Sequence, residues 1–313
     1  MRRALGFLGD WGVALLSLAY LLALGPLVPG FLSAPNLGNV VSNVLPLLAV
    51  ALGQTLVLVT GGIDLSVTAT VALASVAGAK VMTESGGAFP GNAALGIAAM
   101  LAVGIGVGLV NGIAVARLRM PPFLATLAVM TFASGFAIWS TRSQGIAGLP
   151  ASFRVLGGTT LGGAPLSLLV VVPLALLAHL LLSRTVFGRW LYAVGSNARA
   201  ARVSGVPVER LLVLAYVACG LCAAVAAVLY SARLETGSPV LGQRIFLDVI
   251  GGTSLFGGRG TVRGTAFGVL FITLVDNSLN LMGLSSFTIL MVKGGVILAA
   301  AVLDALRERL VGR

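Results

Sequence analysis

The stretch GGTSLFGGRGTVRGT, from Gly251 to Thr265, leads into a long apolar sequence that continues to Asp304. A few polar residues interrupt this apolar sequence, and among them are Asp276, Asn277, Asn280 and Lys293. Such residues are costly inside a lipid bilayer unless they face one another, water or a passing solute. The stretch therefore predicts a membrane-embedded protein with a polar pathway. It also predicts a helix that is broken near Gly251-Gly252.

The composition of the whole chain supports a membrane protein. Hydrophobic residues make up 58% of the chain and charged residues 9%, and the mean hydropathy is +1.06. Soluble domains average about 25% charged residues. The net charge of +11 comes from basic residues scattered in short clusters between apolar runs, which is typical of orientation signals and not of a nucleic-acid-binding face.

Apolar runs along the chain predict the number of crossings. A helix needs about 20 residues to cross a hydrocarbon core of about 30 Å. We count ten runs, at Trp11–Val28, Val41–Val59, Leu65–Met82, Ala93–Ala116, Pro122–Ser140, Leu166–Leu182, Leu211–Tyr230, Phe246–Leu255, Gly264–Met282 and Phe287–Leu303. The fold class is therefore all-α, a polytopic membrane protein of about ten transmembrane helices in a single domain, residues 1–313. Breaks or re-entrant segments are expected near Gly61-Gly62 and Gly251-Gly252.

Most lysines and arginines fall in loops on one side if the ten helices alternate, which predicts that both termini are cytoplasmic. The longest basic loop on that side covers residues 183–210. Ser196 and Asn197 are good helix caps, so Ala198–Val203 is predicted to be a short helix that ends before Gly205 and Pro207. From composition alone, a solvated connector is an equally good interpretation.

Four stretches carry a resemblance to a known family. They are GQTLVLVTGGIDLSV (Gly53–Val67), GLVNGIAVARLRMPPFLATLAVMT (Gly108–Thr131), GRWLYAVGSNARAARVSGVPVER (Gly188–Arg210) and IGGTSLFGGRGTVRGTAFGVL (Ile250–Leu270). In this order they resemble the permease subunits of ribose-type sugar ABC importers, within the wider branched-chain amino-acid and monosaccharide permease family. The resemblance extends from about Asn36 to Asp304.

The resemblance implies a permease in a bacterial-type inner membrane that moves a sugar or related polyol. It implies three partners: a periplasmic sugar-binding protein, a cytoplasmic ATPase, and a second permease that is a copy or a sibling. It also implies that the loop 183–210 is the coupling element that touches the ATPase. The residues carried over for this contact are Asn197, Arg199, Ala200, Ala201, Arg202, Ser204 and Gly205.

ATP chemistry is expected in the partner. A phosphate-binding loop needs a lysine followed by serine or threonine. Lys80 precedes Val81 and Lys293 precedes Gly294, so neither fits. We therefore expect no cofactor in this chain, with ATP and Mg²⁺ bound by the ATPase, and no catalytic residue or metal site.

Polar residues inside apolar runs are candidates for the pathway: Gln54, Asp64, Asn111, Asp276, Asn277 and Asn280. Each has a structural alternative. Asp64 is placed to cap a helix starting at Leu65, Asp276 to pair with Lys293, and the amides to join helices. Asp248 is expected to pair with Arg244, four positions earlier. Cys219 and Cys222 are expected to be helix-packing residues, because they lie within an unbroken apolar run.

Two other classes of function remain open at this point. An ion-coupled secondary transporter of a small polar solute would carry its ion on buried acids such as Asp64 and Asp276 and would need no ATPase. A membrane enzyme is disfavoured, because no H-E-x-x-H motif or Ser/His/Asp constellation is evident. Reconstituted transport separates the first alternative from the importer.

Overall fold

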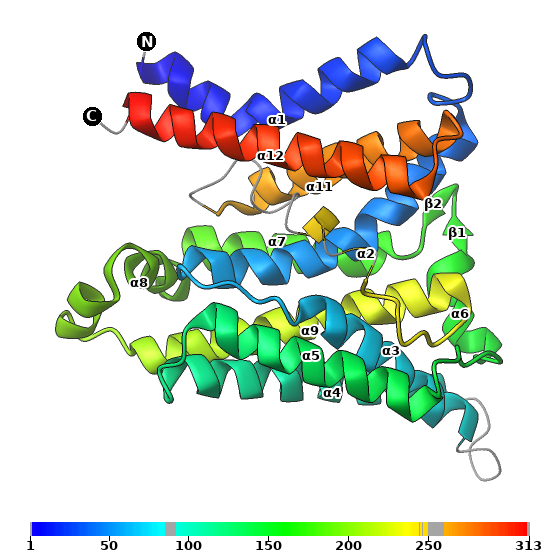
Figure 1. The fold of residues 1–313 in the computed structure, drawn as a ribbon, viewed down its shortest axis with the longest axis horizontal. Coiled ribbons are helices and arrows are strands. Elements are labelled where there is room, and N and C mark those ends of the chain that lie inside the picture. The colour runs from blue at the N-terminus through cyan, green and yellow to red at the C-terminus, as the bar shows by residue number, and fades with distance from the viewer. Residues whose placement is uncertain (1, 85–91, 244, 246, 250–259, 312–313) are drawn as a thin grey trace.

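The structure is a computed structural model that describes residues 2–84, 92–243, 245, 247–249 and 260–311, and nearly all of these residues are helical. The helices and strands are α1 (Arg2–Leu24), α2 (Ala34–Val59), α3 (Val67–Glu84), α4 (Ala93–Ala116), α5 (Pro122–Thr141), α6 (Ala151–Gly158), β1 (Thr160–Leu161), β2 (Ala164–Pro165), α7 (Leu168–Arg184), α8 (Val186–Val203), α9 (Val208–Leu234), α11 (Val262–Leu281) and α12 (Ser286–Val311). The long helices lie roughly along one direction and form a bundle (Figure 1).

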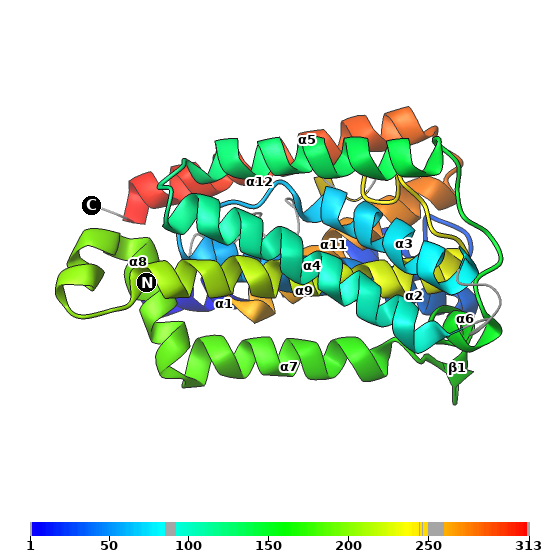
Figure 2. The same ribbon diagram turned by 90° about the horizontal axis from the view of Figure 1, so that it is seen from below.

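The two ends of the bundle differ. Helix α8 protrudes at one end, where α1 begins and α12 finishes (Figure 1). Helix α6 and the β1–β2 hairpin, whose strands pair antiparallel, lie at the opposite end (Figures 1 and 2). The start of α1 and the finish of α12 therefore lie at the same end of the bundle. Figure 2 shows α5 and α7 on opposite faces of the bundle.

Helix α2 contributes many residues to the packed core, and most of its residues are buried. It begins at Ala34, seven residues before the predicted start at Val41. The Ser33 hydroxyl accepts a hydrogen bond from the backbone N–H of Asn36, and proline stands in the first turn. These are ordinary signals for a helix start, and they extend α2 beyond its apolar run.

Helices α4 and α9 pack closely through glycine. A Cβ atom added at Gly104, Gly108 or Gly112 would meet the backbone of α9, whereas one added at Gly106 would meet nothing. The spacing of four residues puts the first three on one helix face. Small residues allow such close contact between helices. In lipid this matters because the surroundings are already apolar, so helices associate through van der Waals packing and not through the hydrophobic effect.

The count of ten transmembrane helices is not confirmed. Within the described residues, five helices are long and apolar enough to cross a membrane: α2, α4, α5, α9 and α11. A sixth span arises if α7 and α8, which meet at an angle of 69°, are taken together. Shorter apolar helices occur at Trp11–Leu24, Val67–Thr83 and Ser286–Val302. The chain is thus a multi-pass helical membrane protein whose apolar runs do not all become full-length helices.

The break predicted at Gly61-Gly62 is confirmed, since the chain between α2 and α3 is not helical and Gly61 has a φ of +78°. Such a φ favours glycine because it has no Cβ. The break predicted at Gly251-Gly252, and most of the run Phe246–Leu255, lie outside the described residues. Helix α6 and the short hairpin were not predicted, because their segments lack a long apolar period.

The two cysteines behave as the sequence indicates. Cys219 and Cys222 are free and buried on α9. A Cβ atom added at Gly53 of α2 would meet both of them. They therefore serve as packing residues between α2 and α9, as expected for buried thiols.

Candidate functional site

Residues 60–66, which we call the extended segment, join α2 to α3 without helical structure; Gly61 is exposed and residues 64–66 are buried. The chain leaves α2 at the end where α8 protrudes and runs back toward the middle of the bundle, where α3 begins (Figures 1 and 2). Irregular backbone at membrane depth exposes N–H and C=O groups that no helix satisfies, so other groups must pair with them. The polar residues around this segment provide those partners.

Asp64 is 3% exposed, and its carboxylate accepts hydrogen bonds from the backbone N–H and the hydroxyl of Ser66, at 2.8 and 2.6 Å. The amide nitrogen of Asn111, on α4, donates to the Ser66 hydroxyl at 2.7 Å and lies 3.4 Å from the Asp64 carboxylate. Helix α3 begins at Val67, two residues after the expected Leu65. Asp64 therefore stabilises the turn that leads into α3.

Gln54, on α2, lies against the backbone of Asp64. Its amide, in the orientation that satisfies both groups, donates to Asp64 O at 3.1 Å and accepts from Asp64 N at 3.3 Å. The hydroxyls of Thr126 and Tyr216 both lie 3.4 Å from the carbonyl oxygen of Ile63. Side chains from α2, α5 and α9 thus satisfy the extended backbone.

We call Gln54, Asp64, Ser66 and Asn111 the sealed cluster, because each is at most 3% exposed. The structure brings together three of the predicted pathway residues, Gln54, Asp64 and Asn111. Their contacts are with backbone, with one another and, for Gln54, with the Cys219 thiol 3.9 Å away. The Oδ1 atom of Asn111 has no hydrogen-bond partner in the described part of the chain.

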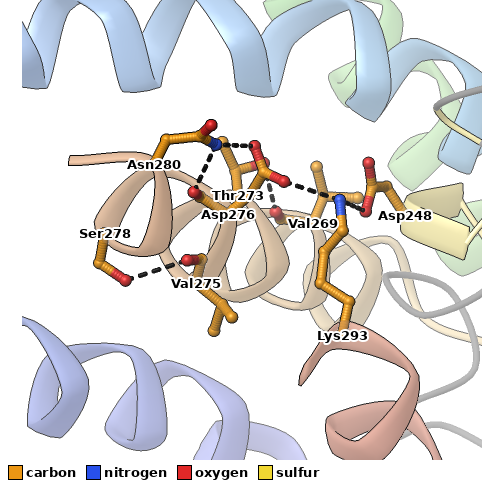
Figure 3. Close-up of polar contacts among 8 residues, drawn as sticks. All are labelled: Asp248, Val269, Thr273, Val275, Asp276, Ser278, Asn280 and Lys293. Atoms are coloured by element: carbon orange, nitrogen blue, oxygen red, sulfur yellow. Dashed lines mark hydrogen bonds and ion pairs between the residues drawn. The ribbon is translucent and has the colours of Figure 1, made fainter. Parts of the chain in front are cut away.

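A second group of polar residues surrounds Lys293 of α12 (Figure 3). The Lys293 ammonium lies 2.8 Å from a carboxylate oxygen of Asp276, on α11, and 2.7 Å from one of Asp248, in the helical turn 247–249. The predicted Lys293–Asp276 pair is therefore confirmed. The predicted partner of Asp248, Arg244, lies outside the described residues, and the structure gives Asp248 an ion pair with Lys293 instead.

We call Asp248, Asp276, Asn280 and Lys293 the open cluster. The Lys293 and Asp248 side chains are 7% and 14% exposed, whereas that of Asp276 is 39% exposed. The exposed Asn280 donates its amide to the carboxylate of Asp276 at 3.1 Å and to its backbone oxygen at 2.7 Å. Two carboxyl groups share one ammonium, and the Asp276 carboxyl presents acceptor oxygens at the surface.

Asn277 belongs to neither cluster. It exchanges two hydrogen bonds with Asn36 of α2, at 2.8 and 2.9 Å. On the next residue, Ser278, the hydroxyl lies 2.7 Å from that of Tyr20 on α1. These contacts join α11 to α1 and α2, so the structure separates Asn277 from the adjacent Asp276.

Helix α8 has a kink at Asn197, where φ is −159° and ψ is 95°. The Asn197 side chain accepts a hydrogen bond from the backbone N–H of Ala200 at 2.9 Å, so Asn197 caps the short helix that the sequence predicts. Arg202 lies 3.6 Å from Glu209 of α9. Gly205, with a φ of +84°, follows the end of the helix.

The other residues of the predicted coupling set divide by exposure. Arg199, Ala200, Arg202 and Ser204 are exposed, and Ala201 is buried. Sequence reasoning missed Val203, whose side chain is 85% exposed at the tip of α8. An apolar residue in a basic, polar loop is the signal that could have identified it, because an exposed apolar side chain there indicates a contact surface.

Three side chains of α5 form a ladder on its exposed face. Phe132 and Phe136 stack with ring centroids 6.2 Å apart, and Phe136 and Trp139 lie 5.7 Å apart. Phe136 and Trp139 also line a hollow of about 640 Å³ together with Lys80, Ser140, Arg142 and Ser143.

Within the described residues, no three His, Cys, Asp or Glu side chains are grouped to hold a metal ion.

Comparison with known proteins identifies the family. Residues 36–301 match the family model described as branched-chain amino acid transport system / permease component. The chain is 40% identical to the ribose import permease RbsC of Bacillus subtilis, over 88% of this chain and 86% of that protein.

Two further relatives match this chain over similar fractions of its length and of their own. The ribose import permease RbsC of Escherichia coli K12 is 35% identical over 93% of this chain and 92% of its own length. The autoinducer 2 import system permease LsrC of an Enterobacter species is 37% identical over 94% and 87%. No solved structure matches the chain. The chain belongs to the family of branched-chain amino acid transport system permease components.

Proposed function

We propose that this chain is the permease subunit of an ABC importer that moves a sugar or related polyol across the bacterial inner membrane. The observation that carries this proposal is the similarity to import permeases over residues 36–301, which includes α8 and the residues of both clusters. The relatives are transport permeases, so this chain conducts the solute and is not an enzyme.

The proposed importer needs three partners. An ATPase that binds ATP and Mg²⁺ docks at the end where α8 protrudes, which makes that end cytoplasmic. A periplasmic binding protein delivers the solute at the opposite end, and a second permease completes the pathway.

We assign solute contact to the open cluster. Asp276 and Asn280 present carboxylate and amide groups at the surface, and such groups bind hydroxyls by hydrogen bonds. The sealed cluster has a structural role in this proposal, since Gln54 and Asp64 hydrogen-bond the backbone of residues 60–66 and Asn111 donates to Ser66. A neutral polyol suits the open cluster because the Lys293 charge is already paired with carboxylates.

Val203 is the proposed centre of the ATPase contact, with Arg199 and Arg202 beside it. An exposed apolar side chain with cations around it fits an apolar groove whose rim is acidic. The contact between Arg202 and Glu209 helps to hold the tip in one orientation, although an exposed pair of this kind contributes little stability.

Transport in proteoliposomes tests the function. The permease, its ATPase and its binding protein are reconstituted together, and uptake of labelled ribose is measured with and without ATP. Uptake that needs ATP and both partners supports the proposal. Uptake by the permease alone, driven by an ion gradient, would replace it with a secondary transporter.

The ATPase contact has its own test. Val203→Asp should reduce co-purification of the ATPase with the permease at least tenfold, because a carboxylate replaces the apolar centre and repels an acidic rim. Val155→Asp is a matched control, since Val155 is a 44% exposed valine on α6 at the opposite end of the bundle. Equal loss in both variants would contradict the assignment.

Orientation is tested with Ser196→Cys, because Ser196 is exposed on α8. The native cysteines, Cys219 and Cys222, are buried, so a membrane-impermeant maleimide reports on the new thiol. Reaction in inverted vesicles and protection in intact cells are expected. Reaction from the outside would contradict docking of an ATPase at α8.

A further inference from the structure

Helix α8 contacts the end of α2 with almost no side chain between them. A Cβ atom added at Gly195 would overlap the carbonyl oxygen of Val59, the last residue of α2. One added at Gly61 would lie 3.8 Å from the carbonyl oxygen of Gly195. The contact is therefore backbone against backbone, two residues before the kink at Asn197.

Tyr192 makes the second contact, one helical turn earlier. Its half-buried side chain donates a hydrogen bond of 2.8 Å to the carbonyl oxygen of Gly260. Thr261 follows Gly260 and caps α11 by accepting from the backbone N–H of Gly264. A Cβ atom added at Gly260 would overlap the side chain of Val59. The end of α2, the start of α11 and the middle of α8 thus meet at one junction.

The two segments that α8 touches lead to the two polar clusters. Val59 is followed by the extended segment 60–66, which contains Asp64 and runs into α3. Gly260 is followed by α11, which carries Asp276 and Asn280. Closely packed groups transmit displacement, and the backbone contact at Gly195 has no rotamer that can absorb it. The Tyr192 hydrogen bond links α8 to Gly260 through a side chain. A shift of α8 would therefore act on both segments at once.

We infer that Gly195 and Tyr192 are the positioning residues that pass movement of α8 to α2 and α11, and thereby to the open cluster. This inference rests on the proposed function, because it needs an ATPase that moves α8. Gly195 makes the backbone contact with α2, and Tyr192 makes the hydrogen bond to Gly260, the residue before the cap of α11. Neither residue is part of the surface around Val203 that meets the ATPase.

The experiment uses the reconstituted importer and a thiol reporter on α11. Leu281→Cys places an accessible cysteine at the last residue of α11, where the native leucine is 43% exposed, while the native cysteines stay buried. The rate of maleimide labelling is measured with the ATPase present, without nucleotide and with ATP plus vanadate. ATP hydrolysis and ATPase co-purification are measured on the same samples.

Tyr192→Phe removes only the hydroxyl. It should reduce the nucleotide-dependent change in labelling rate two- to tenfold, the range expected for one hydrogen bond, while the ATPase still co-purifies. Tyr20→Phe is the matched control, because the Tyr20 hydroxyl makes one hydrogen bond of 2.7 Å to Ser278, which lies on α11 but away from α8. The control should keep the full labelling response.

Gly195→Ala should abolish the labelling response, since its methyl group overlaps Val59. Gly106→Ala is its control, because a Cβ atom at Gly106 meets nothing. If Gly195→Ala fails to fold, Tyr192→Phe alone decides. A full response in Tyr192→Phe, or equal losses in Tyr192→Phe and Tyr20→Phe, would overturn the inference. No nucleotide response in the unmodified permease would instead count against the proposed function.

Discussion

The sealed cluster and the open cluster contain the same kinds of residues in opposite settings. Gln54, Asp64 and Asn111 are each at most 3% exposed, and they bind the backbone of residues 60–66 or one another. Asp276 and Asn280 face the surface and bind Lys293 or each other. Polar residues inside a membrane protein therefore need not mark its pathway, because broken helices create a separate demand for polar partners.

Replacing Gln54 tests the sealed cluster and should have the largest effect. Gln54→Leu leaves the N–H and C=O of Asp64 without their side-chain partner in a buried site. Each unpaired group costs about 1–3 kcal/mol, so the free energy of unfolding in detergent should fall by about 2–6 kcal/mol. Gln243→Leu, at an exposed glutamine, is the control and should change it by less than about 0.5 kcal/mol. Equal effects at both positions would contradict the structural role.

Removing Lys293 tests the charge balance of the open cluster. Lys293→Met leaves Asp248 and Asp276 facing each other without their cation. The expected loss of stability is about 1–3 kcal/mol, below the 3–5 kcal/mol of a fully buried pair, because Asp276 is 39% exposed.

The double variants sharpen this test. Adding Asp248→Leu to Lys293→Met should restore more stability than adding Asp276→Leu, since Asp248 is the less exposed acid, at 14% against 39%. Denaturation of the single and double variants gives the coupling energies. Purely additive losses would contradict a shared ion pair.

Replacing Asn280 or Asn277, two amides on α11, should have the smallest effects of these predictions, and the two effects should differ in kind. Asn280→Ala should raise the KM for solute two- to tenfold and change stability by less than about 0.5 kcal/mol, because Asn280 is exposed. Asn277→Ala should cost about 0.6–1.7 kcal/mol through its lost bonds to Asn36 and leave the KM unchanged. Uptake kinetics and denaturation of both variants check this. A raised KM in Asn277→Ala together with an unchanged KM in Asn280→Ala would contradict the assignment of solute contact to the open cluster.

Much of the fold was predictable because apolar runs and helix breakers act locally. The range Ala93–Ala116 matches α4 at both ends, and the break at Gly61-Gly62 lies where a glycine with positive φ is required. The predicted starts of two longer helices, α2 and α9, were wrong. Helix α2 gains its first turns from the Ser33 cap, and α9 begins at Val208, three residues before the apolar run.

The site was less predictable, because contacts between distant residues decided it. The spacing of Asp276, Asn277 and Asn280 suggests a partly shared helix face. In the structure, Asn277 turns to Asn36 while Asp276 turns to Lys293. The role of Gln54 depends on Asp64 lying beside it, which sequence alone does not show.

The sequence by itself determined that this chain is a helical membrane protein with a capped basic loop, because hydropathy, glycine and capping act through neighbouring residues. Only the tertiary structure decided which polar residues are sealed, which are open, and that α8 meets α2 and α11 at Val59 and Gly260. The physical reason is that burial and pairing depend on residues far apart in the chain, which come together only when the helices pack.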